Sequence, residues 1–560
     1  MKKLALGLAC CLAVSCFASC GGGSDNSASS SGQGGITDET GVKFETMLDN
    51  QGERGLKVEE STTYLIDKDI TGKDYLKLEI KTDVHLRGQF IYVNKEDTTQ
   101  QVVEDFFIEA SDGQEVVEFK QFLDSYRANA KGKFNKILKE IRFTNKSDKE
   151  GKLTLVGAYC SDRKFPDFEL ELYIEKDDLK VGADLTYGGT LTYLERTSYV
   201  DLDGETKELE EVIDNNGNVY IGLNASQDCE QALSSQVNLI NIYDAGRQFQ
   251  QSFYANVGGV MFHDSQGVLQ PGTGEEKNGY TPAWCTTART EGYYWPYNPV
   301  QGGDNACNPS QIIDFEVTED EIYVKTRAMD WAKGDDGRRL PGTILGGETT
   351  KSYMENWYSI INGMLFVKNR FIDWNGFTDM ETVRAHTNEL PAAYVVHPFN
   401  HYVCYTGNYP WSDDEYEVRN DLGPWNIKAY PSYVHLEDWF AWTNDKLFGV
   451  GVYIPGTDTY ASGRSNVSTH MNYKGNKNAN SSPSNTTYRN NKPEATSPYT
   501  SCYTTNTSYT APVVSWTMKT YEPMTYEYVI SVDYVDVMRK QFEDIYESGE
   551  LTNETLSAWK

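Results

Sequence analysis

The chain has 560 residues, which is too long for one small core and predicts two or three domains. Its 82 acidic and 51 basic residues give a formal net charge of −31, which argues against partners such as nucleic acid and strongly anionic glycans. Hydrophobic residues make up 39% of the chain, and Tyr, Phe and Trp are abundant, so we expect a folded, aromatic-rich protein.

The N-terminus predicts an export signal. Two lysines precede a short apolar stretch, residues 4–14, which is too short to span a bilayer. The motif FASC at residues 17–20 resembles a bacterial lipobox, which implies cleavage before Cys20 and lipidation of its thiol; Cys16 is the alternative. We therefore expect residues 1–19 to be a lipoprotein signal peptide and residues 20–37 to be a flexible Gly/Ser tether. The mature protein is expected outside the cytoplasm, with the lipid as its membrane anchor, in the outer membrane.

Residues 38–165 predict a β-sandwich. Runs such as YLKLEIK alternate apolar and polar residues, and turn-like segments separate them. The pair of runs KEIRFTN and KLTLVGAY is similar to bacterial carbohydrate-binding modules. The alternative is a spacer that holds the next domain away from the membrane.

Residues 166–548 form the predicted main domain, which is again dominated by strands. No long amphipathic helix is visible, which argues against a helical toroid or a TIM barrel. Residues 464–510 are rich in Asn, Ser, Thr and Tyr and predict a long polar surface insertion. A short helix over residues 535–548 is expected to close the fold. The predicted fold class is all-β: an N-terminal β-sandwich followed by a large antiparallel sheet structure.

The stretch VNLINIYDAGRQFQQSFY, residues 237–254, predicts a hairpin with many hydrogen-bonding groups. Asp244 and Arg247 lie at its turn, and Gln250 and Tyr254 share one face of the second strand. Burying such groups unpaired costs about 1–3 kcal/mol each, so lining a polar cleft is one way to satisfy them. The alternative is an exposed hairpin with a polar outer face.

A second cluster is the aromatic loop at residues 293–304. Trp295 offers a flat ring for a pyranose, and Asn298, Gln301 and Asp304 offer hydrogen bonds to sugar hydroxyls. The alternative is a loop packed by its own rings.

Three carboxylates are candidates for acid–base chemistry: Asp304, Glu355 and Glu389. Glu355 is flanked by large apolar residues in YMENWY, so we expect burial to raise its pKa and suit it to act as a general acid. Glycoside hydrolysis needs two carboxylates, one as acid and one as base or nucleophile. For each of the three, the alternative is a structural ion pair.

One internal similarity stands out. VKTRAMDW at residues 324–331 and VKNRFIDW at 367–374 share Val, Lys, Arg, Asp and Trp, and indicate either two related strands at one cleft or a chance match. Arg327, in the first copy, is a candidate sugar ligand.

Metals and cofactors are not expected. The cysteines beyond the anchor are scattered without zinc-type spacing, and His397 and His401 lack a third ligand. Cys285 and Cys307 are a candidate disulfide, and buried thiols are the alternative.

Several phrases together resemble exported glycan-utilisation lipoproteins of Bacteroidetes. They are NLINIYDAGRQFQQSFY, YNPVQGGD, EIYVKTRAMDW, YMENWYSIINGMLFVKNRF, ELPAAYVV and YEPMTYEYVISV. The run of strands over roughly residues 180–540 looks like the galactose-mutarotase-like supersandwich, a fold that hydrolases, lyases and epimerases share. The resemblance implies a glycan partner, but it carries over no catalytic residue.

The sequence thus predicts a carbohydrate-active lipoprotein, with glycoside hydrolysis as the first hypothesis. A polysaccharide lyase is the second, in which Arg247, Tyr254 and His386 would neutralise a uronate and move its proton. A non-catalytic surface glycan-binding protein is the third. A glycan is the expected partner, and the oligomeric state is left open.

Overall fold

The structure is a computed structural model of the chain. It describes residues 36–37, 41–73, 75–111, 113, 115–122, 135–162, 171–196, 198–200, 206–208, 211–213, 219–221, 238–240, 248–253, 261–263, 269–271, 293–294, 299–304, 309–330, 349–374, 385–396, 399, 401–419, 437–443, 447–455, 507–517 and 521–553.

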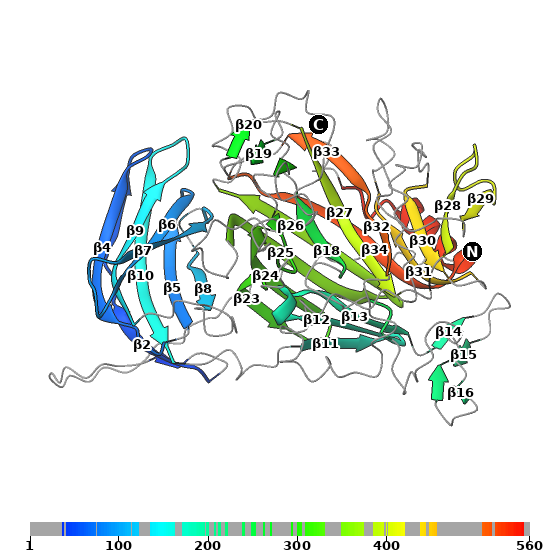
Figure 1. Ribbon diagram of the computed structural model, residues 1–560, viewed down its shortest axis with the longest axis horizontal. Helices are drawn as coiled ribbons and strands as arrows, with labels where there is room; N and C mark the ends of the chain where they lie inside the picture. The colour runs from blue at the N-terminus through cyan, green and yellow to red at the C-terminus, as the bar shows by residue number, and fades with distance from the viewer. Residues whose placement is uncertain are drawn as a thin grey trace, which may run out of the picture.

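Two antiparallel sheets form an N-terminal sandwich, drawn in blue and cyan in Figure 1. The six-stranded sheet has the order β1-β2-β10-β5-β8, with β3 also on β10. Its strands are β1 (Ile36–Thr37), β2 (Lys43–Leu48), β3 (Glu53–Leu56), β5 (Tyr75–Thr82), β8 (Val117–Phe122) and β10 (Gly151–Ser161). The four-stranded sheet has the order β4-β9-β6-β7, with β4 (Ser61–Asp69), β6 (Leu86–Asn94), β7 (Gln101–Ile108) and β9 (Lys136–Asn145). The alternation in YLKLEIK places Leu76, Leu78 and Ile80 in the core between the sheets, each fully buried.

A three-stranded sheet opens the second region. It contains β11 (Glu171–Lys176), β12 (Leu179–Asp184) and β13 (Thr190–Arg196), with the 3₁₀ turn η3 (Leu185–Tyr187) between the last two. Short ribbons follow: β14 (Ser198–Val200) with β15 (Thr206–Glu208), β16 (Glu211–Ile213) with β17 (Val219–Ile221), and β19 (Met261–His263) between β20 (Leu269–Pro271) and β21 (Tyr293–Tyr294).

A fourteen-stranded antiparallel sheet dominates the second region (Figure 1). Its order is β29-β28-β30-β31-β34-β26-β25-β24-β22-β18-β27-β32, with β23 also on β24 and β33 on β27. The strands are β18 (Gln250–Phe253), β22 (Pro299–Val300), β23 (Gln311–Val317), β24 (Glu321–Asp330), β25 (Thr349–Ile361), β26 (Met364–Asp373), β27 (Ala385–Val396), β28 (His401–Tyr405), β29 (Tyr416–Arg419), β30 (Trp439–Thr443), β31 (Phe448–Tyr453), β32 (Thr507–Thr510), β33 (Val513–Thr517) and β34 (Met524–Tyr534).

The two faces of this sheet pack against different partners. Side chains alternate along β25, so Met354 and Tyr358 enter the main core with β11 to β13, while Tyr353 enters the core of the N-terminal sandwich. We call the side of Met354 the inner face and the side of Tyr353 the outer face.

The sheet curls so that β18 crosses the inner face of β25 and β26. The Gln251 side chain donates to the carbonyl oxygen of Glu355 at 2.9 Å, and the ring of Phe253 stacks on Phe371 with centroids 3.8 Å apart. This curl encloses the main core.

The sandwich is attached to the outer face by polar and apolar contacts. Tyr353 Oη accepts from the backbone N–H of Phe107 at 3.3 Å, and the Gln311 amide donates to the carbonyl of Phe122 at 2.9 Å. The ring of Trp374 stacks on Phe107 within the core of the sandwich.

One α-helix, α2 (Val535–Ser548), is described, and Gly549 caps it in the left-handed conformation with φ 65°. The helix expected at these residues is confirmed, as is the all-β class with its N-terminal sandwich and large antiparallel sheet. Within the described residues, no helix has the length and apolar character needed to cross a membrane. Cys160 is a buried thiol, and both cysteines of the candidate disulfide lie outside the described residues.

Candidate functional site

Five of the predicted sugar ligands lie outside the described residues: Asp244, Arg247, Tyr254, Trp295 and Asn298. Cys20 does too, and the side chain of His386 is not described. The structure therefore leaves these residues, and with them the lyase hypothesis, as predictions.

Gln250 and Gln301 lie beside each other and hold the backbone in place. Gln301 is fully buried; its amide donates to the Gly188 carbonyl at 3.2 Å, and its oxygen accepts from the N–H of Gln251 at 3.2 Å. Gln250 accepts from the N–H of Gly302 at 2.9 Å. These bonds tie the turn after η3 to β18 and the residues after β22, so in this conformation the two amides serve the fold.

Glu389 lies on β27 and Asp304 follows β22, the two strands that flank β18. Ser252 of β18 is in register with Glu389 of β27 on one side and with Val300 of β22 on the other, and Asp304 follows β22 closely. Both carboxylates are buried, with exposed fractions of 7% and 1%. The sheet order thus places two of the three acid–base candidates on either side of β18.

Arg327 joins the large sheet to the sandwich. Its Nε donates to the carbonyl of Thr350 at 2.8 Å, and its Nη1 donates to the carbonyl of Asp105 at 2.7 Å. The guanidinium also lies over the ring of Trp374, 5.5 Å from its centroid. These contacts use two of the N–H donors of the guanidinium and hold it between the large sheet and the sandwich.

Glu355 lies on the outer face of β25, whereas Asn356, the next residue, is on the inner face, where it accepts a bond from Gln251. Direct register pairs place Glu355 in one row across four strands, between Lys325 and Arg370, with Asp314 beyond Lys325. Residues paired in this way project on the same side of a sheet, so the row alternates carboxylate and cation.

The bonds of Glu355 fix it as a carboxylate. Tyr323 Oη donates to Oε1 at 2.8 Å, Lys325 Nζ lies 4.0 Å from Oε1, and Arg370 pairs with Oε2. Arg370 also pairs with Glu109, at the edge of the sandwich. Burial alone would raise the pKa of Glu355, but Lys325, Arg370 and Tyr323 together lower it below its usual value. The expected rise of this pKa is therefore wrong, because the sequence showed the apolar flanks and not the cations on adjacent strands.

Asp314, at the other end of the row, has the opposite shift. Burial raises its pKa and outweighs Lys120, whose Nζ lies 3.3 Å away, and the neighbouring Lys325. Two carboxylates on one sheet face thus differ in the direction of their pKa shifts.

A parallel row of rings lies beside the charged row. Tyr323, Trp357 and Lys368 are register partners on β24, β25 and β26; the two ring centroids are 5.1 Å apart, and Lys368 Nζ lies 5.3 Å from the centroid of Trp357. Both rings are half-buried and Lys368 is exposed. We call Tyr323, Lys325, Trp357 and Lys368 the outer-face platform.

The sequence held part of the signal for this platform. The described part of the first similar segment, residues 324–330, is the C-terminal part of β24. The second, residues 367–374, is the C-terminal part of β26 with the residue after it. Both strands flank β25. Because β25 runs antiparallel to each, the matched segments place Lys325 and Arg370 on either side of Glu355. The alternation in EIYVKTR gives Tyr323 and Lys325 a common face, but only the sheet order brings Trp357 beside them.

Among the residues that the structure describes, no group of three or more His, Cys, Asp or Glu side chains is placed to hold a metal ion.

Comparisons with known proteins add little. No family model matches the chain. No curated protein matches it either. A putative aldose 1-epimerase from Escherichia coli K12 is 10% identical, with a TM-score of 0.26, over 65% of this chain and 99% of that one. A protein in glycosyl hydrolase family 38 from Enterococcus faecalis is 8% identical, also with a TM-score of 0.26, over 85% of this chain and 46% of that one. TM-scores this low do not establish a common fold, so the functional argument rests on the geometry above.

Proposed function

We propose that this protein is carbohydrate-active and binds a glycan on the outer-face platform. The observation that carries the proposal is the pair of half-exposed rings, Tyr323 and Trp357, set beside fixed charged groups. Such rings offer a flat apolar surface to the C–H face of a pyranose. Lys325, in the next row, offers a donor to its hydroxyls.

The charge of the chain bears on the kind of glycan. A formal charge of −31 on the protein repels polyanionic glycans at long range, whereas it does not repel a neutral glycan. We therefore expect a neutral polysaccharide or oligosaccharide to be the ligand.

Binding can be tested by titration calorimetry against a panel of neutral and acidic glycans. Trp357→Ala should weaken binding by about 2 kcal/mol, or roughly 30-fold, because a central aromatic anchor is lost. Tyr173→Ala is the matched control, since Tyr173 is 39% exposed on β11 and lies outside the platform. Equal affinities of wild type and Trp357→Ala for every bound glycan would show that the platform is not the site.

Glycoside hydrolysis is the second candidate, and the opposed pKa shifts of Asp314 and Glu355 favour it. A hydrolase needs one protonated and one ionised carboxyl group, and different environments produce that difference. Asp314 and Glu355 are two strand spacings apart, or about 10 Å between Cα atoms. Inverting enzymes use one carboxyl group as the acid and the other as the base that activates a water molecule. In this scheme Asp314 protonates the leaving oxygen and Glu355 activates the water.

Asp304 and Glu389, the other two acid–base candidates from the sequence, are tested beside this pair. Products of a glycan panel, identified by mass spectrometry, should gain one water per cleaved bond. Asp314→Asn and Glu355→Gln should each lower turnover by orders of magnitude if their row is catalytic, and Asp304→Asn and Glu389→Gln should do so if the other pair is. Full turnover in all four variants would exclude both pairs.

We also propose that the protein is an exported lipoprotein, anchored through Cys20 in the outer membrane. The lipobox-like motif and the Gly/Ser tether support this. Labelled palmitate should enter the wild-type protein and a Cys16→Ala control but not Cys20→Ala. Equal labelling of wild type and Cys20→Ala would contradict the anchor position.

A further inference from the structure

A second set of aromatic side chains is exposed far from the outer-face platform. Tyr409 and Trp411 lie in the loop between β28 and β29, and Tyr546 lies on α2. Tyr409 is 71% exposed and Tyr546 57% exposed, and the ring of Trp411 stacks on Tyr546 with centroids 5.3 Å apart. We call these three residues the end patch.

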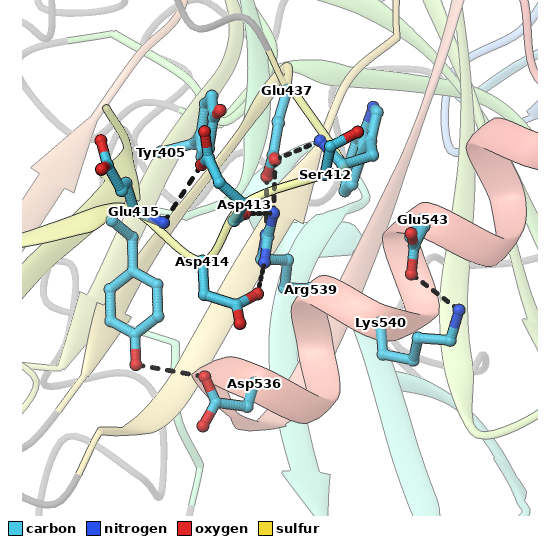
Figure 2. Close-up of polar contacts among 12 residues, drawn as sticks. Tyr405, Ser412, Asp413, Asp414, Glu415, Glu437, Asp536, Arg539, Lys540 and Glu543 are labelled. Carbon is cyan, nitrogen blue, oxygen red and sulfur yellow. Dashed lines mark hydrogen bonds and ion pairs between the residues drawn. The ribbon is translucent and has the colours of Figure 1, made fainter. Parts of the chain in front are cut away.

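A buried ion pair fixes the loop that carries the end patch. The carboxylate of Glu437 accepts from the backbone N–H of Trp411 at 2.7 Å and from the indole N–H of Trp439 at 2.7 Å. Arg539 of α2 donates two further bonds to it, at 2.8 and 2.7 Å, and a third to Asp414 at 2.7 Å. Figure 2 shows Arg539 reaching from the helix between Glu437 and Asp414.

The backbone near the rings is held as firmly. The N–H of Tyr409 lies 2.9 Å from Tyr405 Oη and 3.0 Å from Asp413 Oδ2, and it donates to both. Trp411 has φ 59°, a left-handed conformation that bulky residues rarely adopt. A loop backbone fixed in this way loses little conformational freedom when a ligand binds, which favours affinity.

The rim of the end patch selects the chemistry of its ligand. Asp413 and Asp414 follow Trp411 closely in the same loop, and Asp414 is 97% exposed. Carboxylates at the rim repel anionic ligands and accept hydrogen bonds from hydroxyl groups. Flat rings with acceptors around them complement a neutral pyranose, which has an apolar face and a rim of hydroxyl donors.

The end patch and the outer-face platform belong to one side of the large sheet. Tyr405, Tyr453 and Phe542 form the core under the end patch, and Trp411 and Phe366, the latter on the outer face of β26, both pack against that core. Five strand spacings separate β28 from β25, which is about 24 Å.

We propose that the end patch is a second binding site for a neutral glycan. The ligand class rests on the proposed function, whereas the location rests on the exposed tyrosine rings and the fixed loop backbone. Two sites on one side of the sheet would let a single long chain bind both, with higher apparent affinity than a short one.

Native affinity electrophoresis tests the inference with four neutral polysaccharides, galactomannan, arabinoxylan, laminarin and hydroxyethylcellulose, and with polygalacturonate. The wild type is compared with Tyr409→Ala/Tyr546→Ala, with Trp357→Ala, and with the triple variant. Both tyrosines are largely exposed, so their removal takes little packing from the core, and circular dichroism checks that the fold is kept. We expect at least one neutral polysaccharide to retain the wild type, and the double variant to bind it at least tenfold more weakly. The triple variant should bind more weakly than either parent.

Other outcomes overturn the inference. If the tyrosine double variant keeps the wild-type dissociation constant and Trp357→Ala loses binding, the end patch is not a binding site, and the proposed function still stands. If polygalacturonate alone retains the wild type, or if added decalysine displaces the bound polysaccharide, the ligand of the end patch is not a neutral glycan. No retention of the wild type by any polymer removes the inference together with the proposed function.

Discussion

Replacing Arg539 with methionine tests whether the helix α2 is held by a buried charge. Glu437 is fully buried, and Arg539 is the cation that pairs with its carboxylate among the described residues. Asp414, the other acidic partner of Arg539, is almost wholly exposed, so that contact contributes at most about 1 kcal/mol. Leaving Glu437 buried and unpaired costs about 3–5 kcal/mol, and this term decides the outcome.

Hydrogen exchange at the α2 amides measures the local cost. When reclosing is faster than the chemical exchange step, the exchange rate follows the opening equilibrium, so a loss of about 3 kcal/mol speeds exchange more than hundredfold. Arg539→Met should show this acceleration in α2 and in the loop before β29. Lys540→Met is the matched control, because Lys540 is 60% exposed and its pairs with Glu543 and Asp544 contribute only a few tenths of a kcal/mol.

The double variant Glu437→Gln/Arg539→Met separates charge burial from lost packing. Without the buried charge it should exchange more slowly than Arg539→Met alone, which gives a favourable coupling energy between the two sites. Exchange in Arg539→Met within threefold of wild type, or a double variant whose cost equals the sum of the single ones, would refute the reasoning.

Three further variants test other groups. Burial raises the pKa of Asp533 to about 6, so its folded form binds a proton that the unfolded form has lost; stability should fall by about 2 kcal/mol as pH rises from 4 to 6. Urea unfolding should show a flatter pH profile in this window for Asp533→Asn, and an unchanged profile would contradict the assignment. Glu355 has the opposite sign: its lowered pKa gives stability that is present above pH 4.5 and lost on acidification below it, so Glu355→Gln should reduce the acid sensitivity of unfolding. Gly188→Ala should lower the melting temperature far more than Gly549→Ala, although both have φ near 65°, because only at Gly188 would a Cβ lie 2.0 Å from the Gln301 carbonyl oxygen; equal losses would show that the contact relaxes.

The local elements were visible in the sequence because they depend on near neighbours. The alternation in YLKLEIK predicted a half-buried strand, and the helix over residues 535–548 follows from its apolar spacing, with Val535, Met538, Phe542 and Ile545 buried. Neither pattern contains the order of fourteen strands, since that order depends on pairs such as β34 with β26, which are more than 150 residues apart.

The candidate site was predicted only in part, for the same reason. Glu355 was selected correctly as a buried carboxylate, but the direction of its pKa depends on Lys325, Tyr323 and Arg370 from two other strands. Gln301 looked like a sugar ligand because it is polar and lies near aromatic residues, whereas its amide bonds the backbone at Gly188, more than 100 residues earlier. Side-chain type indicates what a residue can bond, and only the pairing of distant strands decides what it does bond.

The place of β34 has a consequence for how the chain reaches its native state. It follows every other described strand in the chain, yet it lies between β31 and β26 in the interior of the large sheet. In the sheet order, β34 joins one set of strands, β29-β28-β30-β31, to a second set that runs from β26 to β32. Until residue 534 has left the ribosome, β34 cannot join these two sets. The large sheet is therefore completed only after β34 has emerged, through contacts of long sequence separation that form slowly. A chain that is exported before it folds would cross the membrane with these two sets of strands still apart, which allows it to be threaded as an open polypeptide.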